Sequence, residues 1–188
     1  MNHVGVILAA GAGRRFGDAT KQLADLRGRP LLEHALAAML AAEELERVIV
    51  VLGHDADAIR AAVDFGAAEV VIAEDWDEGQ AASLRRGLAA AGGADAVVVT
   101  LGDQPFITPA VISAALSQLE GFDAVRALYD GKPGHPVVLG PAVLAASGEL
   151  HGDQGARELL ARFNVRRWDA SELADAVDVD TPEELQAL

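Results

Sequence analysis

A glycine-rich loop followed by basic side chains is the first feature of the sequence that could bind an anion. The segment Leu8–Gly17 reads LAAGAGRRFG, and Lys21 follows it after three further residues. Glycines allow backbone N–H groups to crowd around a phosphate, while Arg14, Arg15 and Lys21 add positive charge. The segment lacks the Lys-Ser/Thr ending of a Walker loop, and Phe16 stands where a dinucleotide fingerprint needs glycine. The pattern predicts a phosphate-binding loop of another kind.

Asp103 is the first candidate metal ligand. It comes directly after the apolar run 96–101 and its short turn, at the point where a buried strand is expected to end. Thr108 and Pro109 already supply the cap and the first position of the next predicted helix, so Asp103 has no capping task. A carboxylate at the carboxyl end of a buried strand is well placed to hold Mg²⁺.

A second acidic segment, VDVDTPEEL, lies near the C-terminus. Thr181 and Glu184 have the spacing of a capping box, which leaves Asp180 just outside the predicted helix. Alternation along a short strand puts Asp178 and Asp180 on the same side. A carboxylate there could serve only the helix dipole, and the pattern alone does not decide which aspartate faces a ligand.

Two further segments have both a structural and a functional interpretation. Gly79–Leu88 opens a predicted helix with small residues, which leaves room for a flat base or a ribose beside Ser83, although helix initiation explains the same residues equally well. His135 lies between glycine and proline ahead of a strand, a position typical of a solvated turn. No partner residues stand at a spacing that suggests a hydrolytic triad. The chain has no cysteine, which excludes a thiolate nucleophile and a cysteine-bound metal cluster.

The elements that must position these residues alternate between strand and helix. Strands are predicted at Val4–Ala9, Val48–Leu52, Glu69–Ala73, Ala96–Leu101, Ala124–Leu128, His135–Leu139 and Val165–Trp168, and helices at Pro30–Ala42, Asp55–Val63, Gln80–Ala91, Pro109–Leu119, Gly155–Phe163 and from Pro182. Runs such as VIVVL are apolar throughout, as in parallel strands buried on both faces. We therefore expect an α/β fold in one domain over residues 1–188, with a doubly wound, mostly parallel sheet and helices on both faces.

Composition narrows the classes of ligand. Of the 188 residues, 51% are hydrophobic, and 15 basic against 29 acidic side chains give a formal net charge of -14. Such a surface repels nucleic acid and anionic membranes, so neither is an expected partner. A small anion remains compatible with it where Mg²⁺ and local cations neutralise the charge. The sequence has no apolar stretch of about 20 residues and no signal-peptide pattern, and we expect a cytoplasmic protein.

Six segments, taken in order, resemble those of the molybdenum cofactor cytidylyltransferases. They are LAAGAGRRFG with Lys21, GQAASLRRGL, LGDQPF, GHPVVLG, GDQGARELL and VDVDTPEEL, and the resemblance covers Val4 to Leu185. It implies a fold like that of the nucleotide-diphospho-sugar transferases. It also implies Mg²⁺-dependent transfer of CMP from CTP to the phosphate of a molybdopterin acceptor, with release of pyrophosphate. Ala10, the second alanine of LAAG, resembles the cytidylyl-transferring members more than the guanylyl-transferring ones.

The resemblance also implies roles for individual residues. Catalysis would involve Arg15, Lys21 and Asp103, and Mg²⁺ would be held by Asp103 and Asp180. Nucleotide contacts are implied for Leu8, Ala9, Ala10, Gly11, Ala12, Gly13, Arg14, Lys21, Gly79, Gln80 and Ser83. Acceptor contacts are implied for Gln104, His135, Asp153 and Arg157.

Three alternatives stay open at this point. An NAD(P)H-dependent oxidoreductase could use the Gly11–Gly17 loop for a dinucleotide, although the second predicted strand ends in Leu52 and Gly53 without the expected acidic residue. A non-catalytic chaperone could hand a cofactor to a molybdoenzyme, but such a module has no need of two unassigned aspartates. A third alternative keeps nucleotidyl transfer and changes the base or the acceptor.

Overall fold

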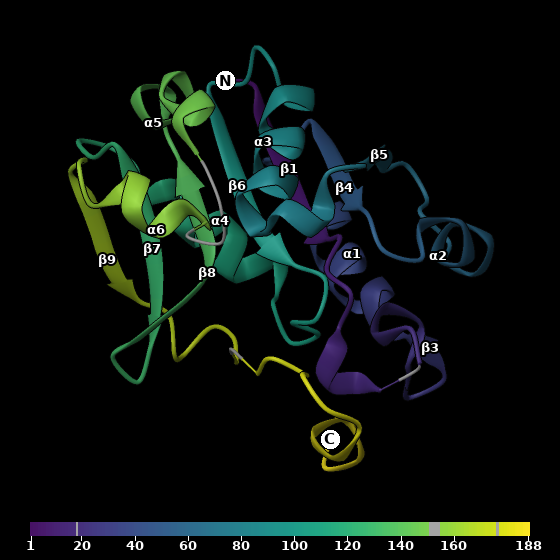
Figure 1. Cartoon of the computed structure of the whole chain (residues 1–188). Helices are drawn as coiled ribbons and strands as arrows, with labels where there is room; N and C mark the ends of the chain where they lie inside the picture. The colour runs from purple at the N-terminus through teal and green to yellow at the C-terminus, as the bar shows by residue number, and fades with distance from the viewer. Residues whose placement is uncertain (18, 151–154, 176) are drawn as a thin grey trace.

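A mostly parallel sheet of seven strands forms the centre of the molecule, in a computed structural model that describes residues 1–17, 19–150, 155–175 and 177–188. The strands are β1 (His3–Ala9), β4 (Arg47–Leu52), β5 (Glu69–Ile72), β6 (Ala96–Leu101), β7 (Ala124–Tyr129), β8 (Lys132–Leu139) and β9 (Val165–Asp169). Their order across the sheet is β5-β4-β1-β6-β8-β7-β9 (Figure 1). Only β8 runs against its neighbours. The predicted fold class is confirmed.

Helices cover both faces of this sheet (Figure 1). They are α1 (Leu31–Leu40), α2 (Ala56–Ala62), α3 (Gln80–Ala90), α4 (Pro109–Ser117), α5 (Pro141–Ala145), α6 (Gly155–Leu160) and α7 (Pro182–Gln186). The helices α1, α2 and α4 share one apolar core with the sheet, and α3, α5 and α6 share the other. No helix in the described part of the chain is long and apolar enough to cross a membrane.

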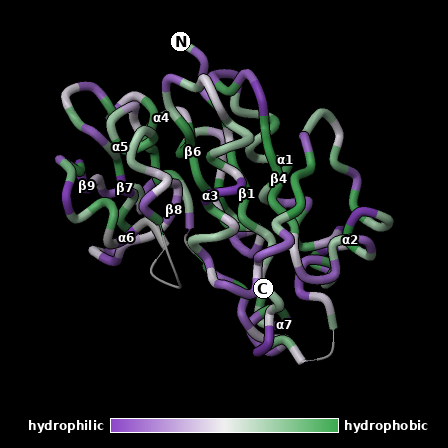
Figure 2. The backbone as a smooth tube through the Cα atoms, turned by 45° about the horizontal axis from the view of Figure 1, so that its top comes forward, coloured by the Kyte–Doolittle hydropathy of each residue, from purple (hydrophilic) through white to green (hydrophobic). Residues whose placement is uncertain are grey.

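The apolar runs of the sequence form the central strands because both of their faces are covered. Every residue from Val48 to Leu52 in β4 is buried, and the same is true of 96–100 in β6. In Figure 2 the strands β1, β4 and β6 carry the hydrophobic colour along most of their length. The carboxyl ends of these strands meet at one edge of the sheet, where a ligand is expected in this type of fold.

The structure corrects several predicted boundaries. The predicted short strand at 177–180 is wrong, since these residues are extended but pair with no strand, although Val179 is buried as alternation required. The strand β8 starts at Lys132 rather than His135 because it continues a hairpin with β7. A hairpin whose strands have two residues each, β2 (Asp25–Leu26) and β3 (Arg29–Pro30), was not predicted, since such short strands leave no periodic pattern.

Close approach of α3 to the sheet depends on Gly87. A Cβ atom added at Gly87 would lie 2.6 Å from Val6 Cγ1 and 3.0 Å from Val51 Cγ2. These contacts are tighter than packed side chains allow, so a larger residue would push α3 away from β1 and β4. The first turn of α3 contributes residues to the site described below, which makes Gly87 a remote determinant of the geometry of that site.

We expect Gly87→Ala to lower the free energy of unfolding by about 1–2 kcal/mol, even though alanine is the better helix former by roughly 1 kcal/mol. Urea denaturation measures this change. Gly148→Ala is the control, because a Cβ there meets no atom within 4 Å. Equal stability of the two variants would show that α3 does not depend on this close contact.

Candidate functional site

A cleft of about 550 Å³ opens at the carboxyl ends of β1 and β6. It is lined by backbone and side chains from four regions: the glycine-rich loop with Lys21 and Gln22, the segment that leads into α3, the end of β6 with the turn after it, and the C-terminal segment. The lining residues are Leu8, Ala9, Ala10, Gly11, Ala12, Gly13, Arg14, Arg15, Lys21, Gln22, Trp76, Asp77, Gly79, Gln80, Ser83, Leu101, Gly102, Asp103 and Asp180. The residues predicted from the sequence to contact nucleotide and metal thus lie around one cavity.

The glycine-rich loop is held open by its own backbone and by one buried glutamine. Gly13 adopts a left-handed conformation (φ +57°), which turns the chain into a short 3-10 helix over Arg14–Phe16. Gln22 Nε2 donates to the carbonyl oxygens of Ala9 (3.0 Å) and Gly11 (3.2 Å). These bonds occupy carbonyl groups in the loop and hold it in one conformation, as an anion-binding loop requires.

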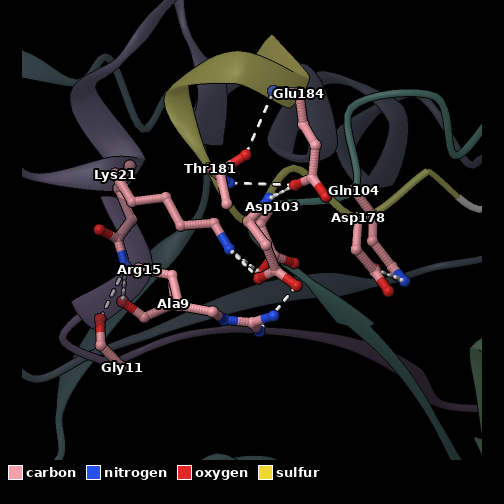
Figure 3. A network of polar contacts seen from close by, with 11 residues as sticks. Ala9, Gly11, Arg15, Lys21, Asp103, Gln104, Asp178, Thr181 and Glu184 are labelled. Atoms are coloured by element: carbon pink, nitrogen blue, oxygen red, sulfur yellow. Dashed lines mark hydrogen bonds and ion pairs between the residues drawn. The ribbon is translucent and has the colours of Figure 1, made fainter. Parts of the chain in front are cut away.

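Lys21 joins two carboxylates at the floor of the cleft (Figure 3). Its Nζ atom lies 2.6 Å from Asp103 Oδ2 and 2.9 Å from Asp180 Oδ1, and the lysine side chain is only 7% exposed. Arg15 approaches from the loop, with Nη2 at 2.7 Å from Asp180 Oδ2. Lys21 and Asp180 are 159 positions apart in the chain, and Arg15 is further still from Asp180, yet all of them meet in one charged cluster with Asp103.

The C-terminal segment is fixed so that Asp180 faces this cluster. The Val179 amide donates to the backbone oxygen of Asp103 (3.0 Å), and the Val179 side chain is fully buried in a small core with Phe16, Leu26 and Leu31. The predicted capping box is confirmed. Its carboxylate, from Glu184, accepts from the amides of Asp180 (2.7 Å) and Thr181 (3.0 Å).

Opposite charges shift the pKa values within the cluster. Burial alone would lower the pKa of the Lys21 ammonium, but the charges and hydrogen bonds of Asp103 and Asp180 raise it above its ordinary value. Burial would likewise raise the pKa of the Asp180 carboxyl, whereas Lys21 and Arg15 hold it below its ordinary range. Lys21 is therefore a cation and Asp180 an anion at neutral pH.

The same carboxylates suit a divalent cation. Asp103 Oδ1 is buried and has no hydrogen-bond partner, so one oxygen in the cluster is available to a ligand. Hard cations such as Mg²⁺ bind carboxylate oxygens. In the described residues no group of three or more His, Cys, Asp or Glu side chains gathers to hold a metal. An ion held by Asp103 and Asp180 would therefore need further oxygen ligands, such as those of a phosphate or water.

The wall of the cleft opposite the loop is built by the start of α3 and an aromatic side chain. Gly79, Gln80 and Ser83 line it as predicted, and Trp76 completes it. The indole of Trp76 packs edge-on against the His54 ring, with centroids 5.1 Å apart. A flat ring system and small residues offer a surface on which a base could stack.

Five of the residues that line the cleft were not predicted from the sequence: Gln22, Trp76, Asp77, Leu101 and Gly102. Gln22 follows Lys21 directly but carries no motif of its own, and only the structure shows its amide bonded to the loop. Trp76 lies three residues before Gly79 in a segment without periodic pattern. A tryptophan close to a candidate base-binding segment was the available signal.

Of the four residues predicted to contact the acceptor, the three that the structure describes do not line the cleft. Gln104 is almost fully buried, and its Nε2 donates to Asp178 Oδ1 (2.6 Å), so it helps to hold the C-terminal segment. His135 is half-buried in β8, and Arg157 is exposed on α6. Asp153 lies outside the described residues.

The sequence resembles a family of nucleotidyltransferases and proteins related to it. The sequence profile of the MobA-like NTP transferase domain matches residues 5–169. The chain is 34% identical to nicotine blue oxidoreductase of Paenarthrobacter nicotinovorans, over 98% of this chain and 95% of that protein. It is 39% identical to 2-C-methyl-D-erythritol 4-phosphate cytidylyltransferase of Cereibacter sphaeroides, over 64% of this chain but only 55% of the cytidylyltransferase.

A solved structure resembles the fold along its whole length. The crystal structure of Rv0371c from Mycobacterium tuberculosis H37Rv superposes with a TM-score of 0.88 at 33% identity, covering 100% of this chain and 96% of the other. The same protein in complex with manganese gives a TM-score of 0.83 at 31% identity, covering 100% and 98%. A neighbour of this fold thus binds a divalent metal.

We expect Lys21→Met to lower the free energy of unfolding by about 1–3 kcal/mol, because it leaves two carboxylates facing each other without their shared cation. Urea denaturation at neutral pH measures the loss. The other lysine of the chain, Lys132, is exposed on β8 and provides Lys132→Met as the matched control. If both variants were equally stable, the Lys21 cluster would contribute nothing to folding.

Proposed function

The chain belongs to the MobA-like NTP transferase domain family, and we propose that it transfers CMP from CTP to the phosphate of molybdopterin or the molybdenum cofactor, with release of pyrophosphate. The observation that carries this proposal is the convergence of Lys21, Arg15 and two aspartates at the open end of a glycine-rich loop. A triphosphate needs cations and backbone amides together with a metal to neutralise its charge. The cleft offers the cations Lys21 and Arg15, the backbone of the glycine-rich loop, and two aspartates that could hold the metal.

In this proposal some residues of the cleft bind the triphosphate and others neutralise its charge. The loop amides and Arg14 would hold the β- and γ-phosphates, while Lys21 and Arg15 would neutralise the α-phosphate. Asp103 and Asp180 would hold Mg²⁺. When bound, this ion would stabilise the charge that develops on the phosphate oxygens.

The chemistry needs no general base from the protein. An oxygen of the acceptor phosphate forms a bond to the α-phosphorus of CTP, and the bond from that phosphorus to the oxygen bridging the α- and β-phosphates breaks. The electron pair of the broken bond leaves with pyrophosphate. Because the attacking phosphate is already ionised, catalysis reduces to orientation and electrostatic stabilisation. No histidine is among the described residues that line the cleft with Lys21 and Asp103, which is consistent with this scheme.

Three observations support the finer choice of substrates. A cytidylyltransferase is among the relatives, and Ala10 stands in the LAAG form of the loop that resembles cytidylyl transfer. The order of the six motifs supports a pterin acceptor. A molybdoenzyme that receives the product would be the next partner.

A redox function is the second candidate, because a curated relative that matches 98% of this chain is named nicotine blue oxidoreductase. An NAD(P)H-dependent enzyme could place its dinucleotide in the same cleft. Against it, β4 ends in Leu52 and is followed by Gly53 and His54 rather than by the acid that binds a ribose in dinucleotide folds. Fold and family do not by themselves separate the two reactions.

We expect Asp103→Asn to reduce transfer of label from α-³²P-CTP to the pterin acceptor by about 10²–10³-fold, because an amide is a poor ligand for Mg²⁺ and removes one negative charge. The asparagine keeps the shape of the side chain and an oxygen for Lys21, so the fold should survive. Label transfer and pyrophosphate release are measured with and without Mg²⁺, and circular dichroism checks the fold.

Asp57→Asn, an exposed change on α2, is the matched control and should leave the rate unaltered. Near-wild-type transfer by Asp103→Asn would remove Asp103 from the metal site. Mg²⁺-independent oxidation of NAD(P)H by the wild-type protein, together with no label transfer, would favour the redox candidate instead.

A further inference from the structure

Three arginines gather on the half of the sheet that lies beyond the cleft. Arg126 on β7 and Arg167 on β9 are direct partners in the parallel register, so their side chains leave the same face. That face is the one covered by α6, since Ala124 and Val165, two residues before each arginine, pack with Leu159 and Leu160 of this helix. Figure 1 shows α6 beside β7 and β8.

Arg157, on α6, completes the group, which we call the arginine cluster (Arg126, Arg157 and Arg167). Its charge is close enough to Arg126 to act on it: burial first, and then the charges of Arg157 and Arg167, lower the pKa of Arg126. Arg157 and Arg167 are exposed and Arg126 is half-buried, so a ligand from solution can reach the cluster.

No counter-charge faces the arginine cluster among the side chains that the structure describes, which do not include those of Asp18, Asp153 and Glu158. No described Asp or Glu oxygen lies within 4.0 Å of these three guanidinium groups, although the chain carries 29 acidic residues. Arg126 Nε is buried without a hydrogen-bond partner, and so is Nδ1 of His135. Burial together with the charge of Arg126 lowers the pKa of His135 to about 4, so this histidine is neutral at pH 7 and adds no further positive charge.

An uncompensated group of like charges with unused donors costs free energy in the ligand-free protein. Guanidinium groups present their donors in a planar fork that matches the oxygens of phosphate-like or carboxylate anions. In a chain with a net charge of -14, keeping three arginines together with no acidic partner among the described side chains is best explained by an anion that occupies the space between them.

We propose that the arginine cluster binds a second anionic group of the acceptor, distinct from the phosphate that reacts in the cleft. This inference rests on the proposed nucleotidyl transfer. It assigns to Arg126 and Arg167 a part in acceptor recognition, beside Arg157 and His135.

The register of the sheet relates the cluster to the cleft. In β6 and β8, Val99 pairs with Val137, and continuing this antiparallel register sets His135 opposite Leu101, which lines the cleft. The next strand, β7, carries Arg126, where an irregularity in the pairing with β8 begins. With a strand spacing of about 4.8 Å, β6 and β7 lie roughly 10 Å apart. The cluster therefore begins two strands beyond the strand whose end lines the cleft, and one acceptor could extend from the cleft to it.

The test uses sodium sulfate as the probe, with the full-length ¹⁵N-labelled protein and ionic strength held constant by sodium chloride. The Nε–Hε signals of Arg126 and Arg167 report on this site alone, whereas sulfate bound at the glycine-rich loop would shift the signals of Arg14 and Arg15. We expect the Arg126 and Arg167 signals to move together and to saturate with one Kd.

The double variant Arg126→Gln/Arg167→Gln, followed through the remaining Arg157 signal, should weaken sulfate binding about tenfold or more. Arg60→Gln/Arg166→Gln is the matched control, since it removes the same charge. Arg60 is exposed on α2, and Arg166 neighbours Arg167 on β9 but stacks over the Phe122 ring on the opposite face. The control should bind sulfate like the wild type.

The transfer reaction gives the second readout. In the Arg126→Gln/Arg167→Gln variant, KM for the acceptor should rise about tenfold or more while KM for CTP stays unchanged. Arginine signals that do not respond to sulfate, or an unchanged acceptor KM, would overturn the proposal. Failure of the wild-type protein to transfer label, with sulfate still bound at the cluster, would instead remove the proposed reaction and leave an anion site whose ligand belongs to another reaction.

Discussion

The structure of the site depends on one ammonium group held between two carboxylates. Lys21 Nζ lies within 2.9 Å of both Asp103 and Asp180, and it joins the segment after the first strand, the loop after β6 and the C-terminal segment. Without a cation in this position, the two carboxylates would repel each other and separate the segments that form the cleft. A metal ion held by Asp103 and Asp180 would therefore compete with the Lys21 ammonium for the same carboxylate oxygens. A bound triphosphate would offer Lys21 a new anionic partner, which is a physical reason to expect metal and nucleotide to bind together.

The fold explains why these charges meet. Parallel strands bring the ends of β1 and β6 to one edge of the sheet, and the amide of Val179 attaches the C-terminal segment beside Asp103. Six of the 15 basic residues of this acidic chain lie in two groups that an anion could use: Arg14, Arg15 and Lys21 by the cleft, and the arginine cluster beyond β8. An acceptor with two anionic groups would bridge these two positions.

The sequence predicted the strands of the large sheet, the helices other than the five-residue α5, and the glycine-rich loop, because each depends on local pattern: apolar strands, capping residues such as Thr108 and Thr181, and clustered glycines. It did not predict the ion pairs of Lys21, since contacts between residues 82 and 159 positions apart depend on the packing of distant segments. The arginine cluster was not predicted from the sequence for the same reason. The pairing of Arg126 with Arg167 follows from strand order and register, which a single sequence does not specify.

On this mechanism, the cleft binds a nucleoside triphosphate through a metal held by Asp103 and Asp180. Thermal unfolding with CTP, GTP, ATP, UTP and NAD(P)H, each with and without Mg²⁺, tests it most directly on the wild-type protein and on Asp103→Asn. We predict that CTP stabilises the wild type most, by about 2.7 kcal/mol at a hundredfold excess over Kd, and only with Mg²⁺. The Asp103→Asn variant should lose this stabilisation. Stabilisation by NAD(P)H and by no triphosphate would contradict the account.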